Sequence, residues 1–80
     1  MKAYLITFRS ITLAQRGEAA LQRAGIGCVL RRTPRWIEQR GCGYGVEARL
    51  SDPQEGIRLL QGIPYRRIYR LTDDGVEELR

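Results

Sequence analysis

The sequence has no histidine, only two cysteines and a single lysine, and no long apolar run. Without histidine, the chain lacks the usual general base and the usual zinc ligand of proteins. Two thiols cannot fill a tetrahedral zinc site or build a disulfide scaffold. A membrane-spanning helix needs about 20 consecutive apolar residues, and the N-terminus lacks the layout of a signal peptide. We therefore expect a cytoplasmic protein without metal or cofactor, whose chemistry depends on a thiol, a carboxylate or a bound ligand.

The length of 80 residues limits the chain to one small domain. Such a chain buries only about 60–65% of its unfolded surface, so its core is one layer of helices on one sheet. Hydrophobic residues make up 42% and charged residues 29%, a balance typical of folded proteins. These limits exclude a Rossmann domain, a barrel and a two-domain enzyme with a deep cleft.

The charge is unevenly distributed along the chain. Thirteen of the fourteen basic residues are arginine, and residues 1–72 carry a net charge of +8. Residues 73–80 carry a net charge of −3. We therefore expect a single domain over residues 1–72 and an acidic C-terminal tail over 73–80, with at most one helical turn. A body of this charge favours an anionic partner such as RNA, an acidic protein face or a small anion, although solvated arginine faces are common.

Periodicity and turn residues predict the order strand, helix, strand, strand, helix, strand. Ser10 is placed to cap the first helix and Gly25 to end it, and Asp52 followed by Pro53 begins the second. Gly17 weakens the first helix by about 1 kcal/mol unless a close packing contact requires it. The predicted strands cover residues 3–8, 26–32, 44–50 and 67–72, and the predicted helices lie between 10 and 25 and between 52 and 62.

This order predicts a ferredoxin-like α+β sandwich, in which an antiparallel four-stranded sheet carries two helices on one face. Right-handed crossovers place the first and third strands in the centre of the sheet. The other face of the sheet is then open to solvent or to a partner.

Cys42 is the candidate reactive residue. It lies between Gly41 and Gly43, which let the backbone bend and leave the sulfur uncrowded. Arg35 and Arg40 are close in sequence and favour the thiolate by lowering the thiol pKa. An exposed thiolate suits sulfur transfer, selenium transfer or redox sensing, whereas a bystander cysteine in a tight turn is the structural alternative.

Cys28 alternates with Ile26 and Leu30 in the second predicted strand, which indicates a small core residue. If Leu30 pairs with Val46, Cys28 pairs with Ala48. Cys42 is then six residues farther along the strand direction, roughly 20 Å away. Because disulfides hold their Cα atoms within about 7 Å, we expect no bridge between the two cysteines.

A second interpretation of the same segment is RNA binding by the open sheet face. Residues 40–46 partly match the RNP1 pattern, which lies on the third strand of this topology. Tyr44 fits one stacking position, and Tyr4 on the first strand is a candidate for another. Cys42 stands where the pattern has an aromatic residue and Gly45 where it has an aliphatic one, so the platform is weak. Stacking contributes about 1–3 kcal/mol per base, and few aromatic residues are present.

A third group of candidates is the basic cluster of Arg66, Arg67 and Arg70 beside the fourth predicted strand. Such a cluster binds an anion or a partner protein, or it forms a solvated face. A third interpretation of the whole chain is a homodimeric interaction module that covers its sheet with a second copy.

The sequence resembles a family of small bacterial proteins described as selenium/sulfur carriers, and the resemblance covers about residues 2–71. The resemblance rests on Phe8-Arg9-Ser10, on Ala14, Glu18 and Leu21 in the first helix, on Thr33-Pro34-Arg35, on Ile37 and on Cys42-Gly43.

The resemblance implies that Cys42 holds sulfur or selenium as a persulfide or selenopersulfide, beside a turn formed by Pro34 and Arg35. It also implies that donor and acceptor are other proteins, so that the chain is a co-substrate and not an enzyme. The alternatives of an RNA-binding module and of a homodimeric interaction module remain open at this point.

Overall fold

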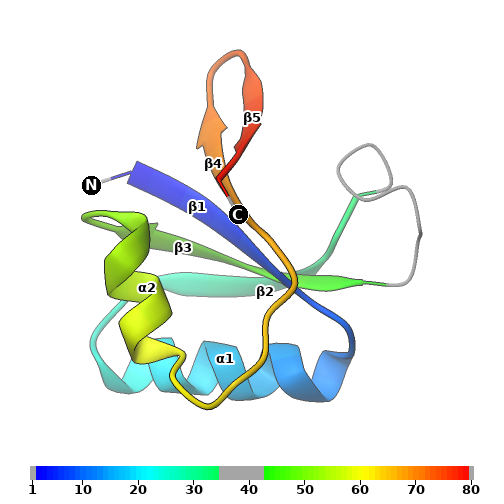
Figure 1. The fold of residues 1–80 in the computed structure, drawn as a ribbon, viewed down its shortest axis with the longest axis vertical. Coiled ribbons are helices and arrows are strands. Elements are labelled where there is room, and N and C mark those ends of the chain that lie inside the picture. The colour runs from blue at the N-terminus through cyan, green and yellow to red at the C-terminus, as the bar shows by residue number, and fades with distance from the viewer. Residues whose placement is uncertain (1, 35–42, 80) are drawn as a thin grey trace.

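The computed structural model describes residues 2–34 and 43–79. Its elements are β1 (Lys2–Phe8), α1 (Ile11–Arg23), β2 (Cys28–Arg32), β3 (Tyr44–Leu50), α2 (Pro53–Leu59), β4 (Ile68–Thr72) and β5 (Gly75–Glu78). The strands form one antiparallel sheet in the order β2-β3-β1-β4-β5 (Figure 1). The α+β class and the antiparallel sheet are confirmed, and β1 and β3 lie inside the sheet as predicted.

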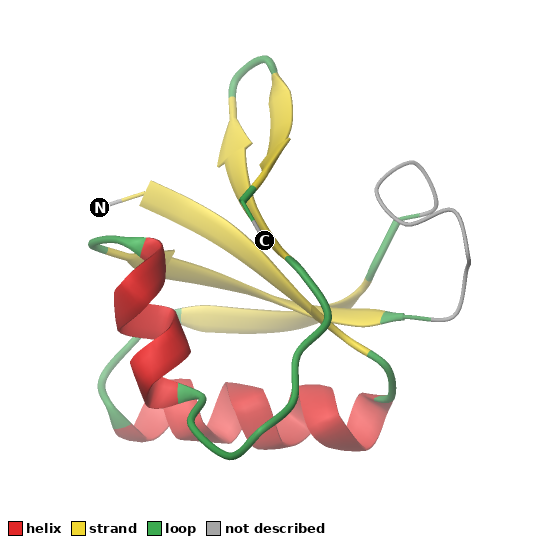
Figure 2. Ribbon diagram, viewed as in Figure 1, coloured by secondary structure: helices red, strands yellow, loops and turns green. Residues whose placement is uncertain are grey.

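The prediction of four strands is wrong, because residues 75–78 form a fifth strand at the edge of the sheet. Gly75 has a φ of +136°, which favours glycine and lets the chain turn back after Thr72. Arg70 stands opposite Glu77 in the register and forms an ion pair with it. The carboxylates that resemble a solvated tail in the sequence are therefore cross-strand partners of arginines. Figure 2 shows this hairpin standing away from the other three strands.

Both helices begin where the sequence places their caps. The Ser10 side chain accepts a hydrogen bond from the Leu13 N–H at 3.2 Å, and Asp52 Oδ1 accepts one from the Glu55 N–H at 3.0 Å. Gly25, with a φ of +81°, ends α1. These side chains satisfy N–H groups that have no partner inside the helix.

The core lies between the two helices and one face of the sheet. Alternate residues of β1 and β3 point to the same face, and this face is buried against α1 and α2. The buried cluster comprises Tyr4, Ile6, Phe8, Ala14, Leu21, Val46, Ala48, Leu50, Leu60 and Ile68.

The opposite face of the sheet is not the open surface that the sequence led us to expect. Leu5 is 2% exposed, Thr7 is fully buried and Tyr69 is 5% exposed, although all three point away from the helix-covered core. Exposure on this face is found farther out, at Val29 of the edge strand β2. A broad platform for a partner is therefore absent from the middle of the described sheet.

Gly17 lies where α1 approaches both β1 and α2. A Cβ added there would lie 2.6 Å from Phe8 Cζ and 3.3 Å from Leu60 Cδ2, and both of these side chains are buried. The close packing contact that justifies glycine inside the first helix is therefore present.

We expect Gly17→Ala to destabilise the protein by about 1–3 kcal/mol, because overpacking the core outweighs the gain of up to about 1 kcal/mol in helix propensity. The measurement is urea unfolding followed by circular dichroism. Gly27→Ala is the matched control, because its added Cβ would meet nothing within 4 Å. Equal midpoints for the two variants would contradict the packing argument.

Candidate functional site

The candidate site lies at the end of the sheet where β2 ends and β3 begins. Their last register pair is Arg32 with Tyr44, and beyond it the Thr33 N–H donates to the Gly43 carbonyl at 3.1 Å. Pro34 follows Thr33 and has no N–H to continue the pairing. Thr33 and Gly43 therefore lie together at one end of the sheet (Figure 2). We call them the anchors of residues 34–42, the Cys42 segment. Four of the predicted site residues lie outside the described residues: Arg35, Arg40, Gly41 and Cys42.

Thr33 and Gly45 form an unusual contact beside these anchors. A Cβ on Gly45 would lie 2.8 Å from Leu5 Cδ1 and 3.2 Å from Thr33 Oγ1, so glycine is required for these side chains to fit. Thr33 is only 5% exposed, and its buried hydroxyl finds no hydrogen-bond partner within residues 2–34 and 43–79. A buried hydroxyl without a partner destabilises the fold by about 1–3 kcal/mol.

Sequence reasoning missed the role of both residues. It took Gly45 as a departure from an RNA-binding pattern and Thr33 only as part of the motif Thr33-Pro34-Arg35. The available signal was the glycine itself, since glycine inside a strand often marks the close approach of another group.

The other thiol, Cys28, is packed against the core as predicted, and it is a free cysteine. Its register partner is Ala48, as the predicted hairpin requires. The thiol donates to the Glu18 backbone carbonyl at 3.7 Å. Burial raises the pKa of the Cys28 thiol above its ordinary value, and the negative charge of Glu18 raises it further. Cys28 is therefore protonated and a poor nucleophile at neutral pH.

Glu18 has a second contact that explains its place in the motif. Its Oε2 accepts a hydrogen bond at 3.2 Å from the N–H of Leu30, which lies on the edge strand β2. An edge strand presents unpaired backbone groups that invite pairing with another chain. The carboxylate of α1 therefore covers part of this edge and ties the helix to β2.

The predicted basic cluster is divided by the structure. Arg67 Nη1 donates to Glu78 Oε2 at 2.8 Å, and Arg70 forms its ion pair with Glu77. Arg66 has different neighbours. Its backbone N–H donates to the Thr7 carbonyl at 2.7 Å, and the residue lines a hollow together with Arg9. β5 therefore supplies carboxylates to two of the three arginines, and the binding of an anion or partner by this cluster stays a prediction.

The comparisons with known proteins give one match. The model of the family described as "Putative Se/S carrier protein-like" matches residues 3–70. The chain belongs to this family. No curated protein and no solved structure matches it.

For this Se/S carrier-like protein, the family match spans nearly the whole domain and includes both anchors, Thr33 and Gly43. No group of His, Cys, Asp or Glu able to hold a metal ion is found within residues 2–34 and 43–79. Over these same residues, α1 and α2 are too short and too polar to cross a membrane.

The expected aromatic platform for RNA is wrong in this carrier-like chain. Tyr4 is 2% exposed and belongs to the core cluster beneath the helices. Tyr44 lies on the same helix-covered face and packs against that cluster. Neither ring is available on the opposite face of the sheet, so the two tyrosines cannot stack successive bases there.

We expect Thr33→Val to stabilise the protein by about 1 kcal/mol, because valine keeps the shape and removes a buried hydroxyl that has no partner. The measurement is the free energy of unfolding in urea. Thr7→Val is the control: Thr7 Oγ1 is buried but accepts a hydrogen bond from the Arg67 N–H at 3.1 Å, so its loss destabilises the protein. A destabilised Thr33→Val variant would show that the hydroxyl has a partner in solution.

A second prediction concerns the pH dependence of Cys28. In a Cys42→Ser background, alkylation of the native protein should rise with pH only above the ordinary thiol range, whereas the urea-unfolded chain should react at lower pH. Because the raised pKa belongs to the folded state, the contribution of this thiol to stability is complete below the ordinary pKa. It is lost as the pH rises through the raised value.

The variant Glu18→Gln separates the two causes of this shift. It removes the charge but keeps an oxygen that accepts from the Leu30 N–H, so the profile should move only partly back towards the ordinary range. Glu47→Gln is the control, since Glu47 is paired with Arg31 at 3.0 Å and faces away from Cys28. A native profile identical to the unfolded one would contradict the burial of Cys28.

Proposed function

We propose that this protein carries sulfur or selenium on Cys42. The Cys42 thiolate attacks the terminal sulfur of a donor persulfide, a new S–S bond forms at Cys42, and the S–S bond of the donor breaks. The donor leaves as a thiolate, and the transferred sulfur keeps its oxidation state, so the step needs no separate oxidant or reductant. Selenium follows the same course as a selenopersulfide.

The observation that carries this proposal is that Cys28, one of the two thiols in this member of a carrier-like family, is packed against the core. The chain has two cysteines. Cys28 is packed against the core, and the pKa of its thiol is raised, which suits structure and not transfer. Cys42 is then the thiol that the family function requires.

We assign roles to the neighbours of Cys42 from the chemistry of their side chains and backbone. Arg35 and Arg40 favour the thiolate, and Gly41 gives access to the sulfur. Gly43 is itself buried, and its carbonyl is bound by the Thr33 N–H, so we assign it to anchoring the segment together with Pro34. In this role Gly43 fixes where the chain leaves the sheet, and it does not give access as the sequence suggested.

A carrier acts as a co-substrate and not as an enzyme, and its partners are the donor and acceptor proteins. We place the exchange in the cytoplasm, where thiols stay reduced. We also interpret β1–β4 with the two helices as a ferredoxin-like unit, to which β5 adds an edge strand. The strand order β2-β3-β1-β4 supports this interpretation.

The alternatives have less support. RNA binding loses its two stacking candidates, because Tyr4 and Tyr44 face the helices. The homodimeric module stays a prediction, to be checked by the mass of the protein in solution.

The test uses the Cys28→Ala variant, incubated with a cysteine desulfurase and cysteine and then measured by intact mass. We expect a gain of about 32 Da on Cys42, reversed by a reducing thiol, and an apparent alkylation pKa clearly below about 8. A selenocysteine lyase with selenocysteine, in place of the desulfurase, should give a gain of about 79 Da if selenium is carried.

The matched control is Cys42→Ser with Cys28 intact, which should gain no mass in the same reaction. A slow Cys42 with an unperturbed pKa that takes up neither element would overturn the proposal.

A further inference from the structure

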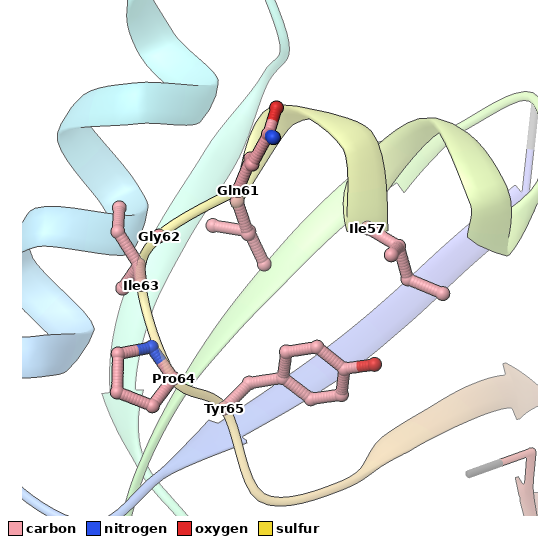
Figure 3. A pocket seen from close by; sticks show the side chains of 7 residues that line it. Ile57, Gln61, Gly62, Ile63, Pro64 and Tyr65 are labelled. Carbon is pink, nitrogen blue, oxygen red and sulfur yellow. The ribbon is translucent and has the colours of Figure 1, made fainter.

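The segment that joins α2 to β4 borders three adjoining hollows. The central hollow, of about 520 Å³, is lined by Ile57, Leu60, Ile63, Pro64 and Tyr65, together with Gln61 and Gly62. We call it the loop groove. Figure 3 shows the Tyr65 ring extending beneath α2 towards Ile57, while Ile63 points towards α1. The loop groove is therefore mainly apolar, with an aliphatic floor and one aromatic wall.

Arginines stand at both ends of the loop groove. Pro64 and Tyr65 also line a second hollow, of about 250 Å³, which Arg9, Leu13 and Arg66 complete. At the other end, Ile63 lines a third hollow that includes Arg16 and Arg23 of α1. No aspartate or glutamate of the described chain lines any of the three hollows.

The positive charges on α1, and of Arg9 just before it, are not balanced within the described fold. In the described part of the chain, Arg9, Arg16 and Arg23 have no carboxylate within ion-pair distance. By contrast, Arg31, Arg67 and Arg70 each have a glutamate as partner. Three of the positive charges that remain for a partner therefore lie beside the loop groove, at its two ends.

One end of this surface lies near the anchors of the Cys42 segment. The register joins Phe8 to Tyr44 and Tyr44 to Arg32 at the same end of the sheet. Arg9 follows Phe8 directly, and Thr33 follows Arg32. A partner seated along the loop groove is thus held beside the end of the sheet from which the Cys42 segment leaves.

We propose that the loop groove and its arginine ends dock an acidic segment of a partner protein that also carries apolar side chains. The apolar side chains fill the groove, and the carboxylates pair with the arginines on either side. An aliphatic floor suits such a segment better than it suits RNA bases, which favour aromatic platforms. The assignment of this partner as a sulfur donor or acceptor rests on the proposed function.

The experiment is an NMR titration of the ¹⁵N-labelled full chain with a short synthetic peptide in which leucines alternate with glutamates. The amides of Ile57, Ile63 and Tyr65 should shift, and the affinity should fall with added salt. Peptides with glutamine in place of glutamate, or serine in place of leucine, should each bind at least about tenfold more weakly. Shifts elsewhere, or equal binding of the serine peptide, would overturn the proposal.

A matched pair of charge reversals tests the arginine ends. Arg16→Glu should weaken peptide binding at least about fivefold, whereas Arg49→Glu, the same change of charge on an exposed residue of β3, should have little effect. Arg9→Glu tests the other end of the loop groove, and it replaces Arg16→Glu in the comparison if that variant does not fold. Equal effects of Arg9→Glu, Arg16→Glu and Arg49→Glu would mean non-specific charge attraction and would overturn the assignment.

Two further arms distinguish other occupants. If dilution of the labelled chain without peptide shifts the amide signals of the groove residues, a second copy occupies the groove. If a single-stranded RNA oligonucleotide shifts the same amides at equal or higher affinity, the surface is a nucleic-acid site. Either result would overturn the proposal of an acidic protein segment.

Peptide binding by Cys42→Ser should equal that of the unmodified chain, because the proposed contacts are made by the apolar groove and its arginines. Failure of sulfur transfer with intact peptide binding would therefore reject the carrier function and leave the docking surface. Failure of peptide binding with intact sulfur uptake would reject the docking surface alone.

Discussion

The pairing of β1 with β3 is the interaction on which the rest of the structure depends. Seven register pairs, from Lys2 with Leu50 to Phe8 with Tyr44, fix which residues face the helices. A shift by one residue would turn every side chain of β1 to the other face. The same register brings the end of β1 next to the start of β3, which also pairs with the end of β2. The start of α1 and the anchors of the Cys42 segment are therefore placed together by backbone pairing.

The helical layer shows how tightly this arrangement is constrained. Gly17 has no room for a Cβ beside Phe8, and Gly56 would bring a Cβ within 2.9 Å of Leu50 Cδ1. Both helices therefore approach the sheet so closely that a Cβ at either glycine would require a core side chain to move. The Glu18 carboxylate adds a polar tie to the backbone of Leu30, and its charge helps to keep Cys28 neutral. One residue of α1 thus stabilises the edge strand and lowers the reactivity of the Cys28 thiol.

Local signals in the sequence predict most of the elements. Ser10 and Asp52 cap the helices because their side chains act within three residues of their own position, and strand alternation works for the same reason. The fifth strand escaped prediction because Glu77 and Glu78 find their ion-pair partners across the hairpin, on Arg70 and Arg67, whereas composition alone resembles a solvated tail. The face of Tyr4 was also misjudged. β1 is apolar on both sides, so periodicity does not distinguish its helix-covered face from the other.

The candidate site was predictable only in part for a related reason. The glycine and arginine neighbours of Cys42 can be read directly from the sequence, whereas the Thr33 contact depends on a strand partner that brings Gly45 and Leu5 beside it. Such a contact joins residues distant in the chain, so local rules do not detect it. The family resemblance did include Thr33 and Glu18, and the structure gives each of them a physical setting.

The distribution of charge links the fold to the docking proposal. The net charge of the whole chain is +5, which by itself indicates only a general attraction for anions. The fold divides this charge, because the carboxylates of β5 pair with arginines at the hairpin while Arg9, Arg16 and Arg23 keep theirs around an apolar groove. Attraction alone gives a fast encounter without orientation, whereas an apolar groove between two charged ends fixes the direction of a bound segment. The proposed transfer of a reactive sulfur between proteins needs that orientation, since the attacking, transferred and leaving sulfur atoms must lie in line.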